Sequence, residues 1–547
     1  MTVDEGNRAK SAQGLKRREF LGATAGALAA LGALPEAEAA PSGWNGGPLA
    51  HLIPAANHER FLIKASFKAP LKTTPKLLVG GVPFDGVRTD AQGRFFRFDV
   101  SGLKPATPYE LRLTDANGAP LCDMWRLKTL PAPDAKVDRL RLLVYTCAGG
   151  YDGPAFQGKT FFLAMALRRR LLARALSFQP DVVIANGDHV YWDLETSQNK
   201  PLAKFIEQNH RAKFGAALDT SVPMLHPKNA ATFLALCDYQ IPGLYGTALR
   251  STPSFFLTDD HDMFENAEFD ANVATLPPET YGKVGAEETQ ALYYPEFLPD
   301  AHRPDFLPGG DKAGLPPGTN MTFGTLRYGA LLEAVLYDCR RYADFKGAHA
   351  KVLPSWVEAW ILARTRAEDT THFFHAPSLP FGYTTGKAGE FYPDVFDEKL
   401  RRLVPFGDKP GWQRGWFAQH QRLLGALAEQ KSRTPLIVQG DLHASAAGRI
   451  VRSGEFALPH PIHLVTAGTL GTGDLAFPSA YRGVQAAPSA LVGIETALAP
   501  TEKNGFTIVD VTPDKLTFAL FAFRPPERAD QIDALRPTII YEVPRKS

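Results

Sequence analysis

The chain has 547 residues, of which 44% are hydrophobic and 22% are charged, and its formal net charge is +2. This length and composition predict a globular protein with a sizeable core, arranged as two domains or as one large domain with an appendage. Because the charges nearly balance and form no basic block, the sequence argues against a nucleic-acid-binding surface.

The first 40 residues resemble a twin-arginine export signal. The segment KRREFL at residues 16–21 precedes a run rich in Ala, Gly and Leu at residues 22–34, and residues 37–39 have the small-x-small pattern of a cleavage site. Such a signal implies the twin-arginine export machinery as a partner and a periplasmic or secreted mature protein. The apolar run is too short for a stable membrane span, although an uncleaved anchor is the alternative.

Residues 45–131 are predicted to form a small all-β domain. Hydrophobic and polar residues alternate at residues 60–67 and 93–100, and turn-forming residues separate the strands. Residues 102–113 resemble the turn and strand of a fibronectin type III domain, in which Tyr109 would hydrogen-bond back to the backbone. We therefore expect a fibronectin-III-like β-sandwich with a structural or positioning role.

A proline-rich linker at residues 131–134 leads into a second predicted domain, residues 138–547, where strands and helices alternate. Apolar residues at helical spacing predict helices at residues 160–176, 356–366 and 413–431. Residues 274–324 are rich in Pro and Gly and are expected to form long loops over a cleft. The second domain is thus predicted to have an α/β fold.

Side chains suited to catalysis or metal binding follow several predicted strands. The apolar strand at residues 182–185 ends in a turn signal, and Asp188 and Tyr191 come just after it. In open α/β sheets, ligand sites gather at the carboxyl ends of strands. Taken alone, Asp188 could be a helix cap and Tyr191 a core residue. The pattern recurs, however, at further strands that end in or lead to Cys147, Asp259, Asp338, His375 and Asp441.

Together these side chains predict a metal centre. A thiol, a phenol, an imidazole and carboxylates suit a trivalent or mixed dinuclear centre better than a structural zinc site, which prefers closely spaced Cys and His. Two metal ions can clamp a phosphate and activate the attacking water. The planar guanidinium of Arg340 could neutralise the phosphate oxygens.

Five motifs occur in order along the chain. They are Cys147, Gly187-Asp188-x-x-Tyr191, Asp259-Asp260-His261-Asp262 with Asn266, Asp338-x-Arg340 and Gly440-Asp441-x-His443. This ordered set resembles the alkaline phosphatase D (PhoD-like) family of calcineurin-like metallophosphoesterases, over residues 140–471. The resemblance implies a metallophosphoesterase β-sandwich core flanked by helices and preceded by the small all-β domain.

The resemblance also implies the metal ligands. Asp188 would bridge two ions, and an iron(III) site would be completed by Cys147, Tyr191 and His443. A second, divalent ion would be calcium in this family, with zinc or manganese as alternatives. Its ligands would be Asp260 and Asp441, with Asn266 as a further candidate. His375 resembles an additional histidine ligand of the broader superfamily.

Two residues are assigned to catalysis by the same resemblance. His261 would stabilise developing charge or protonate the leaving group, and Arg340 would bind the substrate phosphate. The sequence thus predicts an exported phosphoesterase that acts on phosphomonoesters or phosphodiesters. The alternatives are phospholipase D-like cleavage of lipid headgroups, phosphotriester hydrolysis, or a non-catalytic extracellular binding protein with a decayed site.

Overall fold

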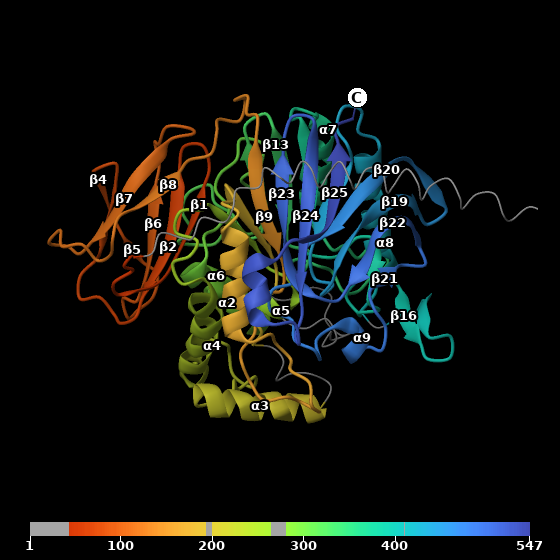
Figure 1. The fold of residues 1–547 in the computed structure, drawn as a ribbon, viewed down its shortest axis with the longest axis horizontal. Coiled ribbons are helices and arrows are strands. Elements are labelled where there is room, and N and C mark those ends of the chain that lie inside the picture. The colour runs from red at the N-terminus through yellow and green to blue at the C-terminus, as the bar shows by residue number, and fades with distance from the viewer. Residues whose placement is uncertain (1–42, 193–199, 264–280, 410, 547) are drawn as a thin grey trace, which may run out of the picture. The chain divides into compact units, whose positions relative to one another are not determined.

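A computed structural model of the chain describes residues 43–192, 200–263, 281–409 and 411–546 (Figure 1). The predicted export signal and Asn266 lie outside the described residues. The chain from Gly43 onwards forms one compact unit, and the predicted division between residues 131 and 138 stays a prediction. Among the described helices, none combines the length and the apolar character that crossing a bilayer requires.

The first eight strands form two antiparallel sheets of four strands each. One sheet has the order β1-β2-β6-β5, with bounds Leu49–Ala56, Phe61–Phe67, Phe95–Val100 and Val87–Arg88. The other has the order β4-β3-β7-β8, with bounds Val82–Asp85, Lys76–Val79, Pro108–Thr114 and Trp125–Lys128. Ile63 and Leu111, one from each sheet, share a buried core. As the fibronectin-like turn predicts, the Tyr109 hydroxyl accepts a 2.8 Å hydrogen bond from the Lys104 amide.

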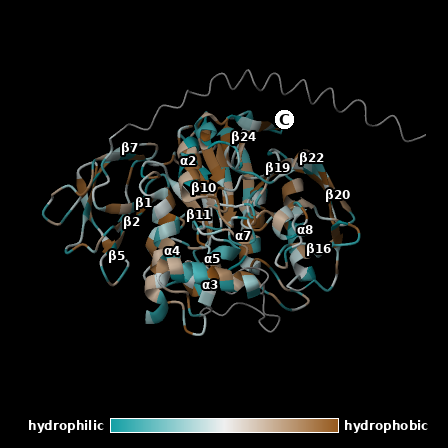
Figure 2. Cartoon of the chain, turned by 60° about the horizontal axis from the view of Figure 1, so that its bottom comes forward, coloured by the Kyte–Doolittle hydropathy of each residue, from teal (hydrophilic) through white to brown (hydrophobic). Residues whose placement is uncertain are grey.

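Two larger sheets form the sandwich that the sequence predicts. The six-stranded sheet has the order β11-β10-β9-β23-β24-β25, with bounds Ser254–Leu257, Val182–Asn186, Leu140–Tyr145, Asn504–Val511, Lys515–Phe523 and Pro537–Pro544. The seven-stranded sheet has the order β12-β13-β14-β18-β20-β19-β22, with bounds Phe323–Tyr328, Leu332–Tyr337, His372–Pro377, Leu436–Gln439, Phe456–Thr466, Ser445–Ser453 and Val492–Thr501. Val144 and Ile184 of the first sheet share one core with Leu336 and Val438 of the second. Figure 2 shows the hydrophobic residues gathered on these strands.

Helices flank the sandwich. Helix α2 (Met165–Leu176) packs against β23, and α8 (Arg414–Ala428) packs against α7 (Ser355–Ala367) and β20 (Figure 1). These three helices are the ones that the apolar spacing predicts. Within the described residues, the other helical segments are α3 (Lys200–Phe214), α4 (Pro227–Tyr245), α5 (Asp260–Met263), α6 (Tyr281–Tyr293), α9 (Pro478–Tyr481) and the 3-10 helix η4 (Ala529–Ala534). Two small two-stranded sheets pair β15 (Tyr383–Thr384) with β21 (Ala487–Pro488) and β16 (Asp394–Asp397) with β17 (Arg402–Pro405).

The stretch at residues 274–324 differs from the predicted long loops, because it contains helix α6. Glycines in this helix suggested a loop, yet they allow close packing: a Cβ on Gly282 would lie 2.0 Å from the Met263 carbonyl oxygen. Helix α6 contacts β2 and β6 of one N-terminal sheet, where buried Lys64 donates to the Ala291 carbonyl at 2.8 Å and pairs with Glu296 at 2.9 Å. The described part of this stretch therefore packs against that N-terminal sheet and then leads into β12 of the seven-stranded sheet.

The strand directions bring separate loops together. Strands β9, β10 and β11 run parallel in one sheet, and β13, β14, β18 and β20 run parallel in the other. Parallel strands end at the same edge of a sheet, so the loops that follow them meet. The Cys147 amide donates to the Gly187 carbonyl at 3.1 Å, and the Asp441 amide donates to the Thr146 hydroxyl at 3.2 Å.

Candidate metal centre

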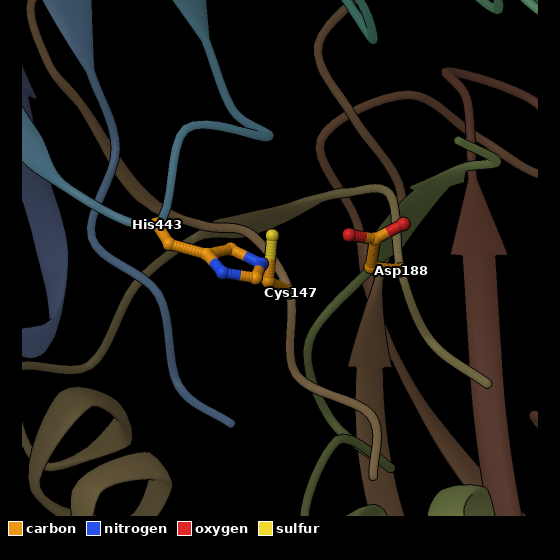
Figure 3. A group of neighbouring side chains, drawn as sticks. All are labelled: Cys147, Asp188 and His443. Carbon is orange, nitrogen blue, oxygen red and sulfur yellow. The ribbon is translucent and has the colours of Figure 1, made fainter. Parts of the chain in front are cut away.

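Three side chains from three different strand ends form the first ligand cluster. Cys147 follows β9, Asp188 follows β10 and His443 follows β18, and all three are buried. Their sulfur, oxygen and nitrogen ligand atoms all lie within 4.8 Å of one another (Figure 3). The Tyr191 hydroxyl joins them, since it donates to Asp188 Oδ2 at 2.9 Å and lies 3.3 Å from His443 Nε2. The structure therefore brings together the four residues predicted for the iron(III) site.

The imidazole of His443 is oriented for metal binding. Its Nδ1 lies 2.7 Å from the Ala476 carbonyl oxygen, and a carbonyl only accepts, so Nδ1 carries the proton. Nε2 therefore presents its lone pair towards Tyr191 and the cluster. Burial, followed by the positive charge of Lys387, lowers the pKa of His443 to about 4, so the ring is neutral at pH 7.

The backbone of the centre is strained. Four predicted ligands have left-handed φ angles although none is glycine: Cys147 (48°), Asp188 (59°), Asp441 (68°) and His443 (51°). Each such residue costs of order 1–3 kcal/mol, and such residues cluster where function requires a particular side-chain direction. The strained backbone therefore lowers the stability of the fold, and it directs these four side chains towards one another.

Two side chains that the sequence analysis did not single out hold the loop that carries Asp188. Asp262 accepts hydrogen bonds from the amides of Asp188 (2.8 Å), His189 (2.8 Å) and Val190 (3.1 Å). Gln240 on α4 accepts from the Tyr191 amide at 2.8 Å. Asp262 lies inside a recognised motif, but nothing in the sequence separates this anchoring carboxylate from the neighbouring ligand carboxylates.

Burial and neighbouring acidic groups disfavour the ionised forms of Cys147, Asp188 and Tyr191 in the first cluster. Burial raises the pKa of the Cys147 thiol well above its ordinary value, and the neighbouring carboxylates raise it further. Burial, followed by Asp260, raises the pKa of Asp188, and burial, followed by Asp188, raises that of Tyr191. A nearby cation would reverse these shifts. Thiolate, imidazole and carboxylate ligands fit a transition-metal ion, so the donor set suits a resident metal.

The second acidic cluster is different, because basic side chains contact three of its four carboxylates. Ligand atoms of Asp188, Asp259, Asp260 and Asp441 lie within 4.8 Å of one another. Lys387 Nζ lies 2.5 Å from Asp441 Oδ1 and 3.4 Å from Asp260 Oδ2. Burial acts to raise the pKa of Asp260, but Lys387 and other nearby positive charges outweigh it, and the pKa falls below its ordinary value. As arranged, these residues do not fit the predicted second cation.

Arg340 lies behind the acidic cluster. Its Nε donates to Asp259 Oδ1 at 2.6 Å, its Nη1 donates to the Gly389 carbonyl at 2.9 Å, and its Nη2 lies 3.5 Å from Asp441 Oδ2. Burial acts to lower its pKa, but these carboxylates raise it above the ordinary value. The guanidinium thus orients carboxylates, which differs from the predicted direct contact with a phosphate.

His375 does not join the centre, contrary to the prediction that it is a ligand. It lies within β14, and its two ring nitrogens contact the Tyr337 hydroxyl at 3.1 Å and the Thr365 hydroxyl at 2.9 Å. Thr365 belongs to α7, on the outer side of the seven-stranded sheet. His375 is therefore a buried structural residue. Asn266 lies outside the described residues.

A pocket of about 660 Å³, open to solvent, leads to the centre. Its polar lining residues include Tyr191, His261, Thr385, Lys387, Asp441 and His443. Its other lining residues are Phe161, Leu202, Leu442, Ala476, Pro478, Tyr481 and Arg482. The His261 ring lies 4.2 Å from that of Tyr191, centroid to centroid, so it faces the space beside the first cluster, as predicted. Sequence analysis missed Lys387, whose only signal is its place in the glycine-flanked segment TTGKAG at residues 384–389.

A family model and two solved structures are similar to this chain. The family model described as PhoD-like phosphatase matches residues 144–520. A solved structure of PhoD is 14% identical, with 88% of each chain covered and a TM-score of 0.54. The purple acid phosphatase PPD1 from yellow lupin (Lupinus luteus) seeds is 10% identical, with 91% of this chain and 75% of that chain covered and a TM-score of 0.53. These two likenesses show the fold. No curated protein matches the chain by sequence.

Proposed function

Because the chain belongs to the PhoD-like phosphatase family and is a metal-dependent phosphoesterase, we propose that it hydrolyses phosphate monoesters or diesters at the first ligand cluster. The convergence of Cys147, Asp188, Tyr191 and His443 is the observation that supports this proposal most strongly. These four residues would hold iron(III). When bound, such a metal supplies Lewis acidity, which lowers the pKa of a coordinated water towards 7.

The side chains around the pocket divide the remaining work. His261 faces the pocket beside Tyr191 and would donate a proton to the departing ester oxygen. Lys387 lines the same pocket and would attract the phosphate oxygens. Arg340 contributes indirectly, since it holds Asp259 and Asp441 in place.

The apolar lining of the pocket supports a particular kind of substrate. Aromatic and aliphatic side chains line the same pocket as the ligand residues Tyr191 and His443, and Arg482 adds a positive charge to that lining. This pairing suits a phosphate ester whose alcohol is apolar, such as an aryl ester or a lipid phosphodiester. We expect kcat/KM for an aryl phosphate diester to exceed that for a phosphate ester of glycerol. Equal values for the two would contradict the assignment.

We also propose that the protein is exported. The support is the KRREFL segment at residues 16–21 and the apolar run that follows it. Replacing Arg17 and Arg18 together by Lys should leave the protein in the cytoplasm, as measured by cell fractionation. Unchanged export of that variant would contradict a twin-arginine route.

Two buried cysteines allow a matched test of the centre. Cys147 lies in the ligand cluster, whereas Cys237 lies on α4, with its sulfur 3.7 Å from the Thr289 hydroxyl. The Cys147→Ala variant should lose bound metal and turnover of an aryl phosphate diester, and Cys237→Ala should keep both. Metal content and turnover that survive in Cys147→Ala would contradict the proposed function.

A further inference from the structure

We propose that the ammonium group of Lys387 takes the place of a second metal cation, so that the centre works with one bound metal ion and one lysine. This inference rests on the proposed function, because it concerns the same pocket. The observation behind it is positional. Lys387 Nζ lies 2.5 Å from Asp441 Oδ1 and 3.4 Å from Asp260 Oδ2, which are two residues predicted to hold the second ion.

The contact is enclosed by the protein. The Lys387 side chain is 8% exposed, and those of Asp260 and Asp441 are 1% and 0% exposed. Water therefore screens these charges very little. Buried carboxylates require a positive partner, and here a side chain of the same chain supplies it.

Both oxygens of Asp441 face a basic side chain. Lys387 contacts Oδ1, while Arg340 Nη2 lies 3.5 Å from Oδ2. A divalent ion bound to Asp260 and Asp441 would have to share their oxygens with this ammonium group or displace it. Like charges at such short range in a buried pocket repel each other strongly.

The loop that carries Lys387 is anchored, so the lysine is directed into the pocket by the fold. Buried Glu390 accepts a hydrogen bond from the Thr385 amide at 2.8 Å and another from the Thr384 hydroxyl. Between these residues and the lysine, Gly386 has a φ of 77°, a conformation that favours glycine. Glu390 and Gly386 together fix the point at which the Lys387 side chain leaves the backbone.

The first cluster offers a contrast. Its donor atoms contact one another, the hydroxyl of neutral Thr146, which lies 3.2 Å from Cys147 Sγ, and the His261 amide, which donates to Asp188 Oδ1 at 3.3 Å. The two ligand clusters thus differ: no ion pair is described for the donor atoms of the first, whereas Asp260 and Asp441 of the second are paired with Lys387. Because Lys387 also lines the pocket, its charge faces an incoming phosphate, as that of a second cation would.

Metal stoichiometry tests the inference. The full chain is incubated with excess iron and then with calcium, zinc or manganese, desalted, and analysed by inductively coupled plasma mass spectrometry. We expect one tightly bound ion per wild-type chain and a second ion in the Lys387→Gln variant. Lys387→Arg, which keeps the charge, should bind one. Lys64→Gln is the matched control: Lys64 is a buried lysine that pairs with Glu296 at 2.9 Å, away from the centre, and its loss should leave the metal content unchanged.

Two tightly bound ions per wild-type chain would overturn the inference, and so would one ion in Lys387→Gln. A second measurement needs no variant. Wild-type crystals soaked in manganese should give one anomalous peak, beside Cys147 and His443. A further peak between Asp260 and Asp441, with Lys387 turned away, would also overturn it. A wild-type chain that binds two ions and keeps full turnover would leave the proposed function standing. A wild-type chain that neither retains metal nor hydrolyses an aryl phosphate diester would refute both the proposed function and the role of Lys387.

Discussion

The carboxylate of Asp262 is expected to be essential for the geometry of the metal centre. Its Oδ1 accepts hydrogen bonds from the amides of His189 and Val190, and its Oδ2 accepts from the amides of Asp188 and Asp259. In the Asp262→Asn variant only one side-chain oxygen remains, so two amides lose their acceptor. A hydrogen bond to a charged group contributes about 1.5–3 kcal/mol, and two lost bonds therefore cost roughly 3–6 kcal/mol.

Asp115 provides a matched control for this change. Its Oδ1 alone accepts from the amides of Asn117 and Ala119, so Asp115→Asn keeps both bonds and should change stability by about 0.5 kcal/mol or less. Urea unfolding would compare the two variants with the wild type, and hydrogen exchange would follow the amides of residues 188–190. Those amides should lose protection in Asp262→Asn. An unfolding midpoint as close to wild type as that of Asp115→Asn, with protection unchanged, would refute the reasoning.

Further substitutions and pH changes test other parts of the structure. Asp188→Asn should weaken metal binding by at least about 100-fold, as measured by equilibrium dialysis, because Asp188 belongs to every ligand group at the centre; unchanged affinity would contradict this. His261→Asn should retain metal but lower kcat by about 10²–10⁴-fold, and a smaller loss would argue against proton donation. Burial lowers the pKa of His420 from 6.5 to about 3. Between these two pH values, His420 is protonated in the unfolded chain and neutral in the folded chain. Stability should therefore fall as the pH is lowered from 6.5 towards 3, as measured by urea midpoints, and a flat profile would contradict it.

The convergence of Cys147, Asp188 and His443 could be predicted because each follows a strand with a clear apolar pattern. Parallel neighbours end at one edge of a sheet, so residues that are distant in the sequence meet there. The sandwich of two sheets was implied by the family resemblance, and the same strands build its core. The apolar pattern therefore predicted where each side chain lies relative to the end of its strand.

The direction of a side chain was harder to predict. Alternate residues of a strand face opposite sides of its sheet, and His375 shares its face with Phe373, which packs in the core beneath α7 and α8. Arg340 follows a strand end as expected, yet its guanidinium group pairs with the buried carboxylate of Asp259. Lys387 could not be placed, because a loop has no periodic pattern and its anchor, Glu390, is recognised only once the fold is known.

Visible absorption on iron loading tests the central claim most directly. A phenolate or thiolate bound to iron(III) absorbs visible light, so titrating the metal-free chain with iron should produce a coloured protein that saturates at one ion per chain. Tyr191→Phe and Cys147→Ser should each shift or abolish the band, whereas Cys237→Ser should leave it unchanged. An iron-loaded protein that stays colourless, or a band that is the same in Tyr191→Phe and Cys147→Ser as in the wild type, would contradict the account.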